Sequence, residues 1–268
     1  MVRKGKTMNG RVRYEIADGI ADVRLSRPEK LNAFDHAMQD ALVETVEALA
    51  QRKDVRCVVL SGDGRAFCAG VDLEGLGTRE PGSLLPRWAG PANKPQQAAY
   101  GWRTLPQPVI AAVHGYAFGA GFQIMLGADM RIAAPDTQLS IMEARWGLAP
   151  DVAGIALLRN LVRDDVAREL TYTARRFDAQ EGVRLGVITR VAEDPHAEAM
   201  ALARTIAANS PDAMRAAKRL MNLMADAQTA EILLAESVEQ TRLIASENHR
   251  ETRAAANEQR APIFRDPA

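Results

Sequence analysis

At residues 55–60 the chain reads VRCVVL, a nearly continuous apolar run with the length of one strand. Such a run is typical of a strand that is covered on both faces, as in a parallel sheet. The pattern returns as PVIAAV at residues 108–113 and, shorter, at residues 129–133. Stretches with helical periodicity separate the three runs. Because strands that alternate with helices are joined by crossovers, the sequence predicts an α/β fold with parallel strands.

The residues before this run predict a hairpin and a helix. Segments 11–15 and 20–25 are short and β-branched, and Asp18-Gly19 between them suits the positive φ angles of a tight turn. From Asp35 to about residue 51, apolar side chains recur at helical spacing, and Asp35 is a candidate N-cap.

The residues after Asp151 predict mostly helix, with one strand candidate at residues 187–191. Ser210 is a candidate N-cap for a helix that begins at Pro211, and another helix is expected at about residues 229–246. These two amphipathic helices must bury their apolar faces on the core or on a partner subunit, and the sequence leaves both open. Glycine and proline crowd residues 73–93, which predicts a long loop that shapes a pocket.

Composition and charge argue against several classes of protein. Among the 268 residues, 34 lysines and arginines balance 34 aspartates and glutamates, so no net field would hold nucleic acid. No apolar run approaches the ~20 residues of a membrane span, and no apolar segment follows the basic start, so we expect a cytoplasmic protein. Two cysteines, Cys57 and Cys68, and no cluster with metal-ligand spacing predict a reduced protein without a metal.

Three segments carry residues suited to chemistry. SGDGRAFCAGVDL (61–73) and HGYAFGAGFQ (114–123) each follow a predicted strand, and a helix is expected to begin near Ala120. Amide N–H groups of both loops would then face one edge of the sheet, as in an oxyanion hole, where each donor is commonly worth ~3 kcal/mol. Tight turns and close helix packing are the simpler interpretations of these glycines.

The third segment is LSIMEARWGLAPD (139–151). A carboxylate such as Glu143 among apolar residues has a raised pKa and can act as a general acid or base. The simpler interpretations are a surface glutamate and, for Asp151, a helix N-cap; from the residues alone the cap is the better interpretation of Asp151.

In their order and spacing, the three segments resemble the crotonase superfamily, also called the enoyl-CoA hydratase/isomerase family. The similarity extends from LSRPEKLNA (25–33) to the C-terminal helices. The resemblance implies an α/β fold of the crotonase type, with a ββα spiral core at residues 1–195 and a helical oligomerisation region at residues 196–268. It further implies an acyl-CoA thioester as substrate, no separate cofactor because coenzyme A is part of the substrate, and a homotrimer or a hexamer built as a dimer of trimers.

The resemblance also assigns residues to the site. The oxyanion hole would consist of the amides of Val71 and Ala120, the latter at a position where the family usually has glycine. For Lys30, a solvated lysine is as good an interpretation as a contact with coenzyme A. The substrate-binding candidates are Lys30, Cys68, Ala69, Gly70, Asp72, Leu73, Gly119 and Gln123.

The expected reaction depends on Gln123, Glu143 and Asp151. The hydratases of the family pair two glutamates, but here Gln123 accompanies Glu143, and an amide cannot accept a proton from water. Asp151 matches the position of a catalytic aspartate in the family's dienoyl-CoA isomerases. We therefore predict isomerisation of enoyl- or dienoyl-CoA through a thioester enolate, with Glu143 and Asp151 as the acid–base pair.

Two further interpretations stay open. The first is an enoyl-CoA hydratase of fatty-acid β-oxidation with Glu143 as its main acid and base. The other ranks below both the isomerase and the hydratase. It is an acyl-CoA hydrolase or dehalogenase with Asp151 as nucleophile, or a member that binds acyl-CoA without catalysis.

Overall fold

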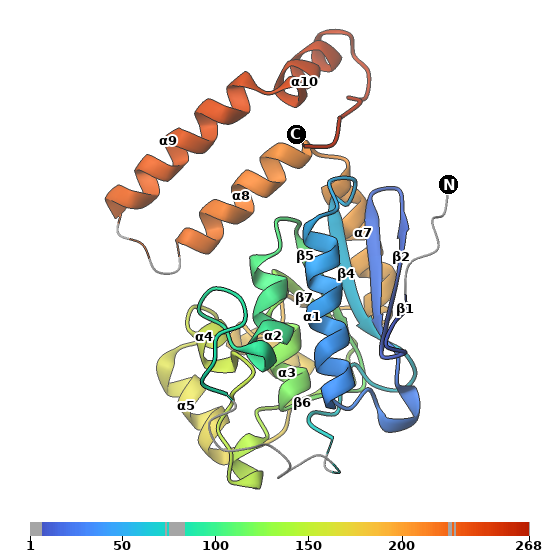
Figure 1. Ribbon diagram of the computed structural model, residues 1–268, viewed down its shortest axis with the longest axis vertical. Helices are drawn as coiled ribbons and strands as arrows, with labels where there is room; N and C mark the ends of the chain where they lie inside the picture. The colour runs from blue at the N-terminus through green and yellow to red at the C-terminus, as the bar shows by residue number, and fades with distance from the viewer. Residues whose placement is uncertain (1–6, 73, 75–83, 225–226, 228, 268) are drawn as a thin grey trace.

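The computed structural model describes residues 7–72, 74, 84–224, 227 and 229–267. Its largest element is a seven-stranded sheet (Figure 1). Across the sheet, the strands are ordered β1 (Thr7–Met8), β2 (Val12–Ala17), β3 (Ile20–Leu25), β4 (Cys57–Gly62), β5 (Val109–Val113), β7 (Met130–Ala133) and β10 (Arg190–Val191). The pairs from β3 to β10 are parallel, and those of β1, β2 and β3 are antiparallel. The predicted α/β fold is confirmed.

Both faces of the central strands are covered by helices, which explains their continuous apolar sequence. Val58 and Leu60 of β4 belong to the core under α1 (His36–Ala50) and α2 (Lys94–Thr104). Cys57 and Val59 point to the other face and pack with α7 (Pro195–Ala207). Figure 1 shows α1 and α2 on one side of the sheet and α7 on the other. Alternate residues of one strand therefore enter two different cores.

Local signals placed the hairpin turn and two helix starts correctly. Asp18 and Gly19 have φ angles of 52° and 75°. The Asp35 carboxylate accepts a hydrogen bond from the Met38 amide, and Ser210 caps α8 (Pro211–Leu223). Two strands differ from the prediction: β4 has the predicted length but lies two residues later, at 57–62, and β10 covers only residues 190–191 of the predicted 187–191.

A second, three-stranded sheet was not predicted. It consists of β6 (Tyr116–Phe118), β8 (Gln138–Ser140) and β9 (Phe177–Asp178). Strands this short have too few residues for a period of two to be recognisable. This sheet lies beside α3 (Ala120–Leu126), which begins at the residue predicted from the sequence.

The remaining elements connect the sheets or extend from them. They are η1 (Pro28–Lys30), η3 (Glu143–Trp146), α4 (Gly154–Leu158), α5 (Asp164–Thr173), α6 (Ala179–Leu185), α9 (Thr229–Ala245) and α10 (Glu247–Asn257). Helices α8 and α9 lie side by side and project from the core (Figure 1). The sequence did not predict α10. The boundary predicted after residue 195 falls inside α7, which packs on the sheet, and that division stays a prediction.

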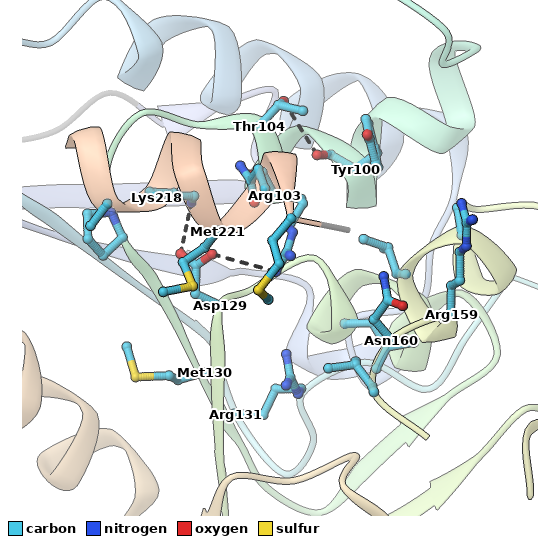
Figure 2. Close-up of a pocket in the computed structure, with 18 of the residues that line it drawn as sticks. Tyr100, Arg103, Thr104, Asp129, Met130, Arg131, Arg159, Asn160, Lys218 and Met221 are labelled. Carbon is cyan, nitrogen blue, oxygen red and sulfur yellow. Dashed lines mark hydrogen bonds and ion pairs between the residues drawn. The ribbon is translucent and has the colours of Figure 1, made fainter. Parts of the chain in front are cut away.

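Helix α8 is joined to the core by a buried cation. The Lys218 ammonium group donates hydrogen bonds to the carbonyl oxygens of Trp102, at 3.1 Å, and Gln107, at 2.8 Å. It also forms a 2.8 Å ion pair with Asp129, drawn in Figure 2. Burial lowers the pKa of Lys218, and the charge of Asp129 opposes that change.

Replacement of this lysine is expected to destabilise the protein. Lys218→Met should lower the free energy of unfolding by about 3 kcal/mol, because it leaves Asp129 with only the more distant Arg103, at 4.0 Å, and two carbonyl groups without this donor. Urea denaturation would measure the change, with Lys53→Met at an exposed position as the control. Equal stability of the two variants would show that the buried contacts contribute nothing.

Candidate functional site

Two of the three predicted segments lie side by side because their backbones pair. The Cys68 amide donates to the Tyr116 carbonyl at 3.0 Å, and the Phe118 amide donates to the Cys68 carbonyl at 3.1 Å. A Cβ at Gly121 would lie 2.3 Å from the Cys68 carbonyl oxygen, so only glycine permits this approach. The end of the first loop is thereby held against the start of α3.

Residues 27–35 hold the first loop from its other side. The Phe34 amide donates to the Gly70 carbonyl at 2.8 Å, and the Asp72 amide donates to the Phe34 carbonyl at 3.0 Å. Arg27 forms a 2.6 Å ion pair with Asp72, and this cation keeps the pKa of the carboxyl below its usual value. Gly70 between these contacts has a φ of 99°, which favours glycine.

The two loops form one wall of a cavity of about 110 Å³. Within the described part of the chain, the amide N–H groups of Val71 and Ala120 donate to no protein group. They are therefore available to a ligand oxygen. The cavity is lined by Ala69, Gly70, Val71, Gly119, Ala120, Met142, Glu143, Trp146 and Leu148.

Glu143 supplies the carboxylate of this cavity. Its side chain is buried, and burial raises its pKa. One carboxylate oxygen, Oε1, accepts a hydrogen bond of 2.5 Å from the Gln123 side chain. The other, Oε2, has no hydrogen-bond partner among the described residues. A buried oxygen without a partner is costly in a folded protein, which marks it as a functional candidate.

Gln123, a substrate-binding candidate from the sequence, does not line the cavity. It is 1% exposed, and its carbonyl oxygen accepts from the amides of Val152 and Gly154, both at 2.8 Å. It therefore contacts Glu143 from behind the cavity wall and is not among the lining residues.

The prediction that Asp151 caps the next helix is wrong. Helix α4 begins at Gly154, its N-cap residue is Ala153, and Ala153 makes no side-chain capping bond. Gln123, from α3, supplies the acceptor that a local cap would otherwise provide. Asp151 is half-buried on the turn before α4, and its negative charge adds, after burial, to the raised pKa of Glu143.

The other candidate residues lie around the two loops. Lys30 is exposed and forms a 2.7 Å ion pair with Glu74. Cys68 is fully buried, and burial raises the pKa of its thiol to about 12, so the thiol is unreactive at neutral pH. Leu73 lies outside the described residues. None of the described histidine, cysteine, aspartate and glutamate side chains gather in a group that could hold a metal ion.

A larger cavity, of about 700 Å³, lies elsewhere, between α8 and residues of α2, β7 and α4 (Figure 2). Its acidic residue, Asp129, is already paired with Lys218. The smaller cavity is the better site for chemistry because it combines two unpaired amide donors with a carboxylate whose Oε2 is unpartnered. Val71, Ala120 and Glu143 line this same cavity.

Sequence reasoning named six of the residues that line this cavity and missed Met142, Trp146 and Leu148. All three stand in the third segment, so their nearness to Glu143 was the available signal. Leu148 is joined to this turn by the hydrogen bond from its amide to the Glu143 carbonyl, at 3.1 Å.

Comparisons with a family model, with curated proteins and with solved structures all point to one family. Residues 15–267 match the family described as enoyl-CoA hydratase/isomerase. An enoyl-CoA hydratase of Mycobacterium tuberculosis is 31% identical over 91% of this chain and 92% of its own length. A mitochondrial Δ(3,5)-Δ(2,4)-dienoyl-CoA isomerase of Mus musculus is 33% identical over 74% of this chain and 64% of its own length. The solved structure of an enoyl-CoA hydratase of Bacillus anthracis superimposes with a TM-score of 0.88 at 28% identity, covering 96% of this chain and all of that one.

Proposed function

Because the chain belongs to the enoyl-CoA hydratase/isomerase family and has the crotonase fold of its structural relatives, we propose that it isomerises a double bond in an enoyl- or dienoyl-CoA. The observation that carries this proposal is the Glu143–Gln123 pair. Glu143 has one unpartnered carboxylate oxygen, and its neighbour is a neutral amide that cannot take a proton from water. Isomerisation needs no water, whereas hydration would depend on Glu143 without a second glutamate beside it.

In the proposed reaction, each proton transfer is assigned to one carboxyl group. For a 3-enoyl-CoA, Glu143 Oε2 takes a proton from the α carbon, and the C–H electron pair moves into the thioester carbonyl. The amides of Val71 and Ala120 stabilise the resulting enolate oxygen. As the carbonyl re-forms, the double bond moves to the α and β carbons, and the γ carbon takes a proton from Asp151. Proton exchange between Glu143, Asp151 and solvent restores the starting state.

Three substrates test the proposal. An isomerase should convert 3-enoyl-CoA or 3,5-dienoyl-CoA to the isomer whose double bonds are conjugated with the thioester carbonyl. The conversion would be seen as a change in ultraviolet absorbance. Consumption of 2-enoyl-CoA alone would instead identify a hydratase, the second candidate, which is favoured by the hydratases among the relatives. Binding of all three without turnover would contradict both.

The second carboxylate is tested by Asp151→Asn. If Asp151 returns the proton, this change should lower kcat for isomerisation about 100-fold and leave the affinity for coenzyme A nearly unchanged. Steady-state kinetics would measure it, and a melting curve would show whether the variant stays folded. Wild-type kcat in a stably folded variant would exclude Asp151 from the mechanism.

We further propose that the enzyme works as a homotrimer or as a dimer of trimers, without a resident cofactor. Exposed apolar side chains on the projecting helix α8, including Met221 and Leu223, support burial against partner subunits. In the described part of the chain, every helix is too short or too polar to cross a bilayer.

A further inference from the structure

We propose that Gln123 is the positioning residue of the site, because its side chain ties the Glu143 carboxylate to the turn that carries Asp151. The inference rests on the proposed proton transfer by Glu143. It assigns Gln123 a role different from holding a water molecule: the glutamine sets the orientation of the group that reacts.

The hydrogen bonds of Gln123 account for this role. Its Nε2 donates to Glu143 Oε1 at 2.5 Å, and its Oε1 accepts from the amides of Val152 and Gly154. A side-chain carbonyl has two acceptor lone pairs, and both are used. The side chain has no acceptor left for a water molecule. One residue of α3 therefore connects η3 with the beginning of α4.

The turn before α4 depends on this connection. Ala153 has a φ of 65°, which residues with a side chain rarely adopt, and it provides no side-chain cap. A Cβ at Gly154 would lie 2.6 Å from the Gln123 carbonyl oxygen, so the approach also requires glycine there. The strain of this turn is offset by the two hydrogen bonds that its amides donate to the Gln123 carbonyl oxygen.

The neutrality of Gln123 matters because the surroundings of Glu143 hold negative charge. The negative charge of Asp151 opposes ionisation of Glu143. A second carboxylate at position 123 would place two oxygens where the 2.5 Å hydrogen bond now lies, and they could not both be ionised. Glutamine donates a hydrogen bond there and adds no charge.

The other charged groups near this turn are paired or exposed. Arg145, on the same turn as Glu143, is exposed. On α5, which packs against η3, Arg168 pairs with Asp164 at 2.7 Å. Asp165 pairs with Arg163 at 2.8 Å. In the described part of the chain, no cation forms an ion pair with Glu143, and the side-chain amide of Gln123 donates a hydrogen bond to its Oε1.

Two substitutions separate the contact of Gln123 with Glu143 from its contact with the turn before α4. Gln123→Glu keeps an oxygen for the amides of Val152 and Gly154 but replaces the donor to Glu143 with a second carboxylate. Gln123→Met keeps the approximate volume and removes both contacts. Gln180→Glu, at an exposed position of α6, is the control for the added charge.

The pH dependence of kcat should move in Gln123→Glu. In the wild type, kcat should rise with pH as Glu143 ionises. In the variant, the paired carboxyls hold a shared proton to higher pH, so the rising limb should shift upward by more than about one unit while the melting temperature changes little. In Gln123→Met, kcat should fall about tenfold or more with a smaller change in KM. The Gln180→Glu profile should match the wild type.

A spectroscopic measurement separates this inference from the proposed reaction. The carbon-13 signal of the Glu143 carboxyl, assigned by its loss in Glu143→Gln, reports ionisation without turnover. An upward shift of its titration in Gln123→Glu supports the positioning role even if the wild type turns over none of the three substrates. An unshifted titration overturns it even if the wild type isomerises. If Gln123→Met does not fold, the titration of Glu143 in Gln123→Glu alone tests the positioning role.

Discussion

Glu143→Gln is expected to reduce kcat by about 10⁴-fold, the upper part of the range for loss of a general base. The glutamine cannot take a proton, but its carbonyl oxygen can still accept the hydrogen bond from Gln123, so the fold and the affinity for coenzyme A should persist. Steady-state kinetics and calorimetric titration with coenzyme A measure the two effects. Glu44→Gln, at an exposed position of α1, is the control. Unchanged turnover would remove Glu143 from the mechanism.

The same variant should also alter the pH dependence of stability. Burial raises the pKa of Glu143 in the folded state above its value in the unfolded chain. The wild type should therefore lose stability as the pH rises from the unfolded value through the folded one, because the unfolded carboxyl ionises first. Glu143→Gln has no such group, so its stability should be flatter across that window. Denaturation at several pH values would measure the difference.

Ala120→Pro should lower kcat by about 10²- to 10³-fold, because it removes one amide donor from the enolate oxygen. Ala120 is the first residue of α3, a position where proline fits the helix and where no intrahelical bond is lost. Ala120→Gly keeps the N–H and should retain activity. His36→Pro, at the exposed first residue of α1, is the control for proline itself.

Steady-state kinetics of the two Ala120 variants, together with a melting curve of each, test this prediction. If folded Ala120→Pro kept nearly wild-type kcat, the Ala120 amide would have no part in stabilising the enolate. If Ala120→Gly lost as much activity as Ala120→Pro, the methyl group and not the N–H would be the important feature.

Several parts of the fold followed from local patterns. The apolar runs that became β4, β5 and β7 predicted strands covered on both faces, and Asp18-Gly19 predicted the hairpin turn. Three segments in order identified the family. The short strands β6, β8 and β9 were missed because they are defined by their partners and not by a period of their own.

The sequence by itself determined the parallel α/β core, the family, and the types of group at the site, because these depend on local periodicity and on motifs read along the chain. Only the tertiary structure decided that Gln123 bonds to Glu143 and to the turn before α4, and that Asp151 does not cap α4. The Gln123 side chain caps a turn 29 and 31 residues away and binds a carboxylate 20 residues away. Contacts at such separations leave no local pattern, since they exist only once α3, η3 and α4 have packed together.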